Sequence, residues 1–169
     1  TRLSSYKKLP LVSKISPSSV TVAESKELEG FKAAQRVAYD CAIDAAQHLE
    51  VGMTEKDAVK WMSEYLTEKG VRGGFHQPLA WFGERSRFKG MRSEGDALAS
   101  NKTLMNESEP VILDVAPILD GYVADIGFSF SLEPNPELIK ARTFLLELRQ
   151  LLPELFASTK TVAEIWKEI

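Results

Sequence analysis

The dipeptide Asp120-Gly121 most constrains the fold, because it stands between two apolar segments, VILDVAPI and YVADIGFSFSL. Asp-Gly between such segments is typical of a β-hairpin with a two-residue turn. A turn of this kind pairs Leu119 with Tyr122 and fixes the register of the strands on either side. The sequence therefore predicts an antiparallel hairpin over these two segments.

Two aspartates, Asp114 and Asp125, lie in the hairpin eleven residues apart. In the predicted register Asp114 faces Gly127 and Asp125 faces Ala116. Because side chains alternate between the faces of a sheet, the two aspartates share a face as diagonal neighbours, roughly 7–8 Å apart at Cα. A turn centred one residue earlier places them directly opposite each other, and only a three-residue loop sends them to opposite faces. Most of the available turns therefore bring the two carboxylates together.

Two carboxylates that converge among apolar neighbours repel each other and lose hydration. A shared proton or a bound cation resolves this conflict, and we favour the cation. Carboxylate oxygens suit divalent ions such as Mn, Mg, Fe, Co or Zn, and paired carboxylates can bridge two ions about 3.5–4 Å apart for metal-assisted hydrolysis. The alternative is structural: Asp125 caps an edge strand, and Asp114 accepts backbone hydrogen bonds.

Two amphipathic helices are expected before the hairpin, over residues 24–49 and 54–69. Apolar residues recur there at helical spacing, and Thr54 begins a segment with the spacing of a capping box. Residues 1–20, rich in Ser, Lys and Pro, show no periodicity and are expected to form a surface arm. The predicted domain therefore spans 21–169.

A third helix is expected after the hairpin, over 137–156, and the segment that follows it resembles the start of the second helix. Trp61 stands seven residues after Thr54, and Trp166 stands seven residues after Thr159, at an offset of 105 residues. This similarity predicts a unit of two helices and strands that runs once in full and then begins again without its strands. The alternative is a chance match between two amphipathic helices.

Composition limits the class of partner. The chain has 169 residues, of which 44% are hydrophobic and 27% charged, which suits one globular domain with a core. The net charge of −3 and the scattered Lys and Arg leave no basic stripe, so nucleic acid is not an expected partner. No apolar run approaches the roughly eighteen residues that span a bilayer. A single cysteine, Cys41, and the lack of a secretory signal predict a cytoplasmic location.

The stretch ILDVAPILDGYVADIGFSFSL resembles the metal-binding hairpin of the pita-bread metallopeptidases, the family of methionine aminopeptidase, aminopeptidase P, prolidase and creatinase. In that family an Asp in an apolar strand is followed, after a Gly-aromatic turn, by a second Asp eleven residues later, and Asp114, Gly121-Tyr122 and Asp125 match this pattern. The likeness covers roughly 24–169. It implies an α/β (α+β) pita-bread fold, in which helix pairs back a curved, mainly antiparallel sheet with a pseudo-two-fold repeat, the second copy being incomplete here.

The resemblance implies a hydrolase: a metallopeptidase of the aminopeptidase or Xaa-Pro peptidase type that splits short peptides with water activated by two divalent ions (Mn, Co, Fe or Zn). Asp114 and Asp125 match two of the family's metal ligands. The His and two Glu that join them in the family have no counterpart in this sequence, and no catalytic residue is assigned. Two alternatives stay open, an inactive module that binds peptides or proteins and a creatinase-like hydrolase of small C–N compounds. A homodimer is also left open.

One histidine is a candidate substrate-binding group. A family histidine that contacts substrate, a couple of dozen residues or fewer before the first metal Asp, has no match, because 77–113 contains no His. His76 lies 38 residues before Asp114, in the segment GFHQPLAWFG. Some aminopeptidase P-like and prolidase-like members have a histidine near an aromatic-Gly strand of this kind. The alternative for His76 is a purely structural role.

Overall fold

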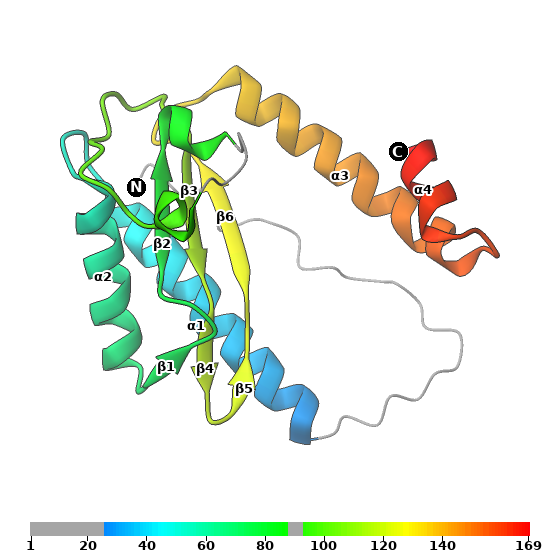
Figure 1. The fold of residues 1–169 in the computed structure, drawn as a ribbon, viewed down its shortest axis with the longest axis horizontal. Coiled ribbons are helices and arrows are strands. Elements are labelled where there is room, and N and C mark those ends of the chain that lie inside the picture. The colour runs from blue at the N-terminus through cyan, green and yellow to red at the C-terminus, as the bar shows by residue number, and fades with distance from the viewer. Residues whose placement is uncertain (1–25, 88–92) are drawn as a thin grey trace.

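A curved layer of antiparallel strands, with helices packed on one face, forms the body of the molecule (Figure 1). The computed structural model describes residues 26–87 and 93–169. The surface arm expected over 1–20 lies outside the described residues. The combination of helices with an antiparallel sheet confirms the expected α+β class.

Both helices expected before the hairpin are present, as α1 (Lys26–His48) and α2 (Glu55–Glu68). The capping box predicted at the start of the second helix is also present. Thr54 Oγ1 accepts a hydrogen bond from the backbone N–H of Asp57 at 3.1 Å, and the Asp57 carboxylate accepts one from the Thr54 N–H at 2.8 Å. Two N–H groups that the first turn leaves without a helical partner are thereby satisfied.

The strands form two adjacent three-stranded antiparallel sheets, ordered β1-β4-β5 and β2-β3-β6. Along the chain they are β1 (Gly73–Gly74), β2 (Leu79–Phe82), β3 (Val111–Val115), β4 (Pro117–Leu119), β5 (Tyr122–Val123) and β6 (Ile126–Phe130). Only a single residue separates β3 from β4, and two residues separate β5 from β6. The two sheets are therefore successive parts of one curved surface (Figure 1).

The hairpin has the register that its turn predicts. Leu119 pairs with Tyr122, and the pairing of β3 with β6 continues the same register. Asp120 and Gly121 both have positive φ, 50° and 87°. Positive φ at both central residues is the property of a type I′ turn, whose twist matches that of the adjoining strands.

The core lies between the sheet and the two N-terminal helices. In β3 buried and partly buried residues alternate, and Val111, Leu113 and Val115 are fully buried on the helix side. Small buried residues such as Ala38 and Ala42 in α1 let the helix lie close to the strands. Each fully buried Val or Leu side chain contributes about 1.5–3 kcal/mol, so this face strongly fixes which way Asp114 points.

A buried carboxylate, that of Glu55, fastens the loop after β2 to the start of α2. Glu55 is 0% exposed. Its oxygens accept hydrogen bonds from the Phe82 N–H at 3.0 Å, from Arg85 Nε at 2.9 and 3.0 Å, and from Ser100 N–H at 2.8 Å and Oγ at 2.6 Å. The 3₁₀ turns in this loop are η2 (Gly83–Ser86) and η3 (Glu94–Ala97).

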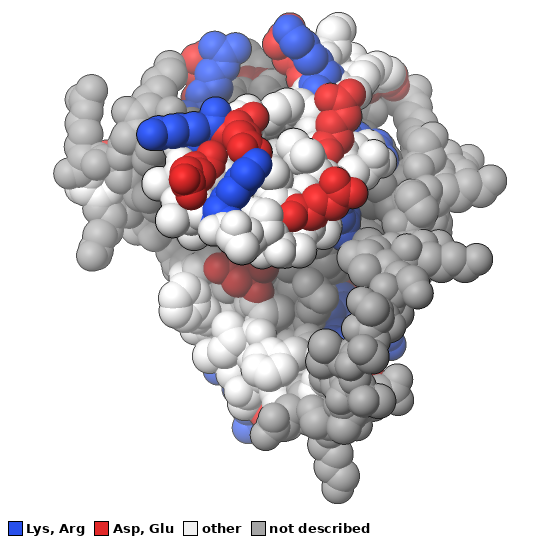
Figure 2. Space-filling model, turned by 90° about the vertical axis from the view of Figure 1, so that its right-hand side faces the viewer, with Lys and Arg blue, Asp and Glu red and all other residues white. Residues whose placement is uncertain are grey.

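The C-terminal helices, α3 (Pro136–Ala157) and α4 (Val162–Glu168), extend away from the sheet (Figure 1). Leu155 and Ile165 are buried, but Phe156 and Trp166 are 62% and 78% exposed. Figure 2 looks onto this end of the molecule, where uncharged surface lies between scattered acidic and basic side chains. No helix among the described residues is both long and apolar enough to cross a bilayer.

The sequence match between the two helix pairs does not extend to the residues that cap α2 and α4. The residue that caps α4 is Thr161, whose side chain pairs with the N–H of Glu164 in a capping box. The counterpart of Thr54 by structural role is therefore Thr161 and not Thr159. The reason is chemical: an acid follows Thr161 by three residues, whereas Val162 follows Thr159 by three.

Candidate metal centre

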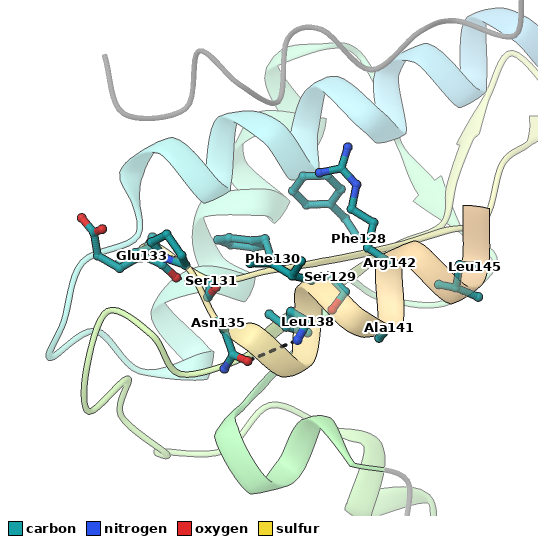
Figure 3. A pocket seen from close by; sticks show the side chains of 14 residues that line it. Phe128, Ser129, Phe130, Ser131, Glu133, Asn135, Leu138, Ala141, Arg142 and Leu145 are labelled. Atoms are coloured by element: carbon teal, nitrogen blue, oxygen red, sulfur yellow. Dashed lines mark hydrogen bonds between the residues drawn. The ribbon is translucent and has the colours of Figure 1, made fainter. Parts of the chain in front are cut away.

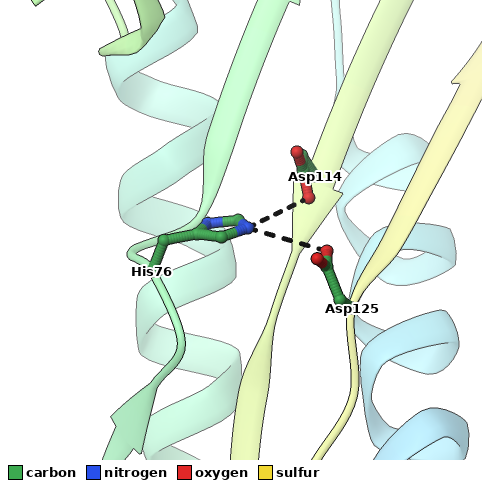
Figure 4. A group of neighbouring side chains, drawn as sticks. All are labelled: His76, Asp114 and Asp125. Carbon is green, nitrogen blue, oxygen red and sulfur yellow. Dashed lines mark ion pairs between the residues drawn. The ribbon is translucent and has the colours of Figure 1, made fainter. Parts of the chain in front are cut away.

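The candidate site lies on the line where the two three-stranded sheets meet. There β3 gives way to β4, β5 gives way to β6, and the chain passes from β1 to β2. His76, Asp114 and Asp125 come from these three neighbouring segments and point toward one another (Figure 4). Because backbone pairing is interrupted here, the side chains of three segments can meet in one place.

The three side chains form a compact group of possible ligands. His76 Nε2 lies 3.5 Å from Asp114 Oδ1 and 3.6 Å from Asp125 Oδ1. One ligand atom from each residue lies within 4.8 Å of the other two. The side chains of His76 and Asp114 are 28% and 23% exposed, whereas that of Asp125 is 57% exposed. The group is therefore recessed at Asp114 and open to solvent at Asp125.

Backbone contacts hold His76 beside the aspartates. The Phe75 N–H donates a hydrogen bond to the Ala116 carbonyl at 2.9 Å. A Cβ on Gly74 would lie 2.5 Å from the carbonyl oxygen of His76 and 2.9 Å from that of Ala116, so the close approach of β1 to β4 requires glycine. His76 Nδ1 lies 2.7 Å from the Gln77 carbonyl oxygen, which fixes the plane of the ring.

Electrostatics distinguish the two acids. Burial raises the pKa of the Asp114 carboxyl above its ordinary value, and the neighbouring Asp125 raises it further, while His76 acts in the opposite direction. Among the described residues Asp114 Oδ1 is buried without a hydrogen-bond partner. A buried acceptor without a partner costs about 1–3 kcal/mol. A cation is the ligand that would satisfy this oxygen and remove the repulsion between the two carboxylates.

The residues fit a transition-metal ion. Carboxylate oxygens suit hard divalent cations, and an imidazole nitrogen adds a ligand typical of Zn, Fe, Ni and Cu sites. The predicted convergence of Asp114 and Asp125 on one face is confirmed by their geometry. Their role as metal ligands stays a prediction.

The position of His76 is something that sequence reasoning did not find. The sequence left it between substrate binding and a structural role, whereas the structure brings it to both carboxylates. The pairing of β1 with β4 places it there, and the only local indication is Gly73-Gly74, two residues before it.

A cavity of about 610 Å³ lies elsewhere, between β6 and the first turns of α3 (Figure 3). Its walls are mostly apolar and include Phe128, Phe130 and Leu138, with Arg142 as a charged group. His76 and the two aspartates are not among its lining residues. This cavity and the metal-ligand chemistry are thus in different places.

Comparison with known proteins gives the family. The model of metallopeptidase family M24 matches residues 29–169. A methionine aminopeptidase from Archaeoglobus fulgidus is 25% identical over 126 residues, which are 75% of this chain and 40% of that protein. The chain thus spans less than half the length of this relative.

Solved structures share the fold. An X-Pro aminopeptidase from Thermotoga maritima superposes with a TM-score of 0.63 at 23% identity, over 73% of this chain and 34% of that one. A Xaa-Pro dipeptidase from Bacillus anthracis gives a TM-score of 0.59 at 20% identity, over 72% and 32% of the two chains. These similarities confirm the expected pita-bread fold. Because the family model covers most of the sequence, the chain belongs to metallopeptidase family M24.

Proposed function

We propose that the protein is a metal-dependent peptidase of the aminopeptidase or Xaa-Pro peptidase type, with short peptides as substrates. Asp114 and Asp125 hold two divalent ions, of Mn, Co, Fe or Zn. The observation that supports this most is the meeting of two carboxylates on one face, with an Asp114 oxygen buried and without a partner. Membership of family M24 and the peptidase names of its similar proteins support the same reaction class.

The two aspartates differ in what they contribute. Ions in such a site activate water and polarise the scissile carbonyl. Asp114, on the buried side, holds an oxygen in a fixed position because its strand is packed in the core. Asp125 lies on the open side, from which a peptide would approach. Phe75, 71% exposed and edge-on to His76 at 6.1 Å, offers an apolar contact for a substrate side chain.

The test uses two aspartates of the same hairpin. Asp125→Asn keeps the shape of the side chain and removes its charge. Asp120→Asn makes the same change at the turn, where φ is 50° and Asn is well tolerated. Calorimetric titration with Mn should show binding lost in the first variant and kept in the second. Hydrolysis of Met-initiated and Xaa-Pro peptides should follow the same order. Unchanged Mn binding by Asp125→Asn would exclude the proposed site.

A second candidate is an inactive module that binds peptides. One observation favours it: the mostly apolar cavity of about 610 Å³ between β6 and α3 does not include His76 or the two aspartates among its lining residues. Binding of a short peptide without hydrolysis, in the presence of saturating Mn, would support this candidate over the peptidase.

A further inference from the structure

We propose that His76 is itself a metal ligand, and that His76 Nε2 and one oxygen from each of Asp114 and Asp125 hold one of the two proposed ions between them. This role rests on the proposed metal function of the two aspartates. It replaces the substrate-binding role expected for His76 from the sequence. It also means that residues 76–125 supply three ligands to one ion, where the two aspartates alone supply two.

The hydrogen bond on the far side of the ring determines which nitrogen faces the site. A carbonyl oxygen only accepts, so His76 Nδ1 must donate its proton to Gln77 O at 2.7 Å. In the neutral ring Nε2 then presents a lone pair. That lone pair and the two carboxylate oxygens are all acceptors, and they converge on the same point (Figure 4). Three converging acceptors require a positive charge at their centre.

The spacing favours a cation over a proton as that charge. A protonated imidazole bound to carboxylates makes charge-assisted hydrogen bonds of about 2.7–2.9 Å. The two distances from His76 Nε2 are 3.5 and 3.6 Å. Two ligands that each lie 2.0–2.1 Å from one tetrahedral ion are about 3.4 Å apart. The observed separations therefore correspond to the edges of a coordination polyhedron and exceed those of a salt bridge.

The Asp114 oxygen that has no hydrogen-bond partner among the described residues also faces His76. Asp114 Oδ1, the oxygen without a hydrogen-bond partner, is the Asp114 oxygen that faces His76 Nε2. The Gln77 carbonyl orients the ring through Nδ1, and the preceding residue, Phe75, is held by its backbone hydrogen bond to Ala116. A ligating histidine is commonly held by such a bond from its other nitrogen.

A nitrogen ligand also sets the choice of metal. Mg²⁺ takes oxygen ligands and keeps several waters, whereas imidazole suits Zn, Fe, Ni and Cu. The centre should therefore bind Zn²⁺ or Co²⁺ more tightly than Mg²⁺. Replacing His76 should reduce this preference together with the affinity.

The experiment exploits the fact that the sequence contains two histidines. Zn²⁺ and Co²⁺ are titrated calorimetrically into the wild-type chain, His76→Gln, Asp125→Asn and the control His48→Gln. The ring of His48 stacks on that of Trp61, with 4.1 Å between the ring centroids, where α1 meets α2. His48 is not a member of the group of possible metal ligands. In parallel, the imidazole ¹⁵N resonances of the wild-type chain are followed as Zn²⁺ is added. This second readout needs no variant to fold.

The expected result is Zn²⁺ binding at least about tenfold weaker in His76→Gln, or about 1.4 kcal/mol, and unchanged in His48→Gln. The ¹⁵N resonance of His76 Nε2 should shift on addition of Zn²⁺, and that of His48 should not. Wild-type affinity in His76→Gln, or a His76 resonance that does not move, overturns the assignment of His76. If Asp125→Asn loses binding in that case, the proposed function stands. If Asp125→Asn also binds normally, both are overturned.

Discussion

Replacing Glu55 by Ala should destabilise the fold more than any other single change of a charged residue in α2. The carboxylate is fully buried and accepts hydrogen bonds from two backbone N–H groups, a serine hydroxyl and the Arg85 guanidinium. It connects the start of a helix, the end of a strand and the loop that returns to β3. Its removal leaves donors of three separate segments without an acceptor.

The loss of stability in Glu55→Ala depends on whether each donor can form a hydrogen bond to water once the carboxylate is removed. Removing one partner of a buried ion pair costs about 3–5 kcal/mol. The Arg85 side chain is 32% exposed, so its guanidinium can regain water and reduce the loss. The Phe82 N–H belongs to a fully buried strand residue and cannot regain a hydrogen bond to water. We therefore expect a loss of about 3 kcal/mol, a large part of the roughly 5–15 kcal/mol that stabilises a typical domain.

Urea unfolding of the metal-free chain, followed by circular dichroism, measures this loss. Glu64→Gln is the matched control in the same helix, because the Glu64 ion pair with Lys60 is long, at 3.9 Å, and exposed. Such a pair contributes at most about 1 kcal/mol. Ser100→Ala, which removes one of the donors, should cost about 1 kcal/mol. A loss below about 1 kcal/mol for Glu55→Ala would refute the view that this carboxylate holds the loop in place.

Three further results are expected. Burial is the main reason that the pKa of Asp114 is raised in the folded chain, so near this pKa the folded state binds more protons than the unfolded state. The metal-free fold therefore loses stability as the pH rises from the ordinary pKa of an aspartate through the raised one. Asp114→Asn removes the carboxylate charge that burial disfavours, so it should stabilise the metal-free chain at neutral pH while abolishing metal binding. Urea unfolding with a chelator tests the stability, calorimetry tests the binding, and a destabilised variant would contradict the reasoning. Gly74→Ala should push the His76 carbonyl away and weaken Zn²⁺ binding at least about tenfold. Equal Zn²⁺ affinity in this variant would contradict the view that Gly74 is needed for the close approach of β1 to β4. Burial, with a smaller effect of Asp44, raises the pKa of Cys41 to about 12, so a thiol reagent at mildly alkaline pH should modify it only after unfolding.

The hairpin was predictable because its determinants are local. Asp120 and Gly121 set the turn, alternation of apolar residues set the faces, and the shared face of Asp114 and Asp125 followed. Helix starts were predictable for a similar reason, as at Thr54, where the cap and its acid lie within one turn.

Two features were not predictable because they depend on contacts between distant segments. His76 reaches the aspartates through the pairing of β1 with β4, for which Gly73-Gly74 is the only indication near residue 76. Glu55, an acid in the first turn of a helix, looks like a solvated residue until the loop after β2 covers it.

The superposition of α1 and α2 on α3 and α4 by a rotation near two-fold stays a prediction.

An ion shared by His76, Asp114 and Asp125 would act as a cross-link where the backbone ladder is interrupted. Joining His76 to Asp114 closes a loop of 38 residues, and joining Asp114 to Asp125 closes one of 11. Unlike a disulfide, such an ion is lost when its ligands separate on unfolding, so it stabilises the folded state by mass action, and a ligand at 100 times its Kd adds about 2.7 kcal/mol. Metal supply would therefore govern how long the folded chain survives proteolysis, independently of whether a peptide is ever bound.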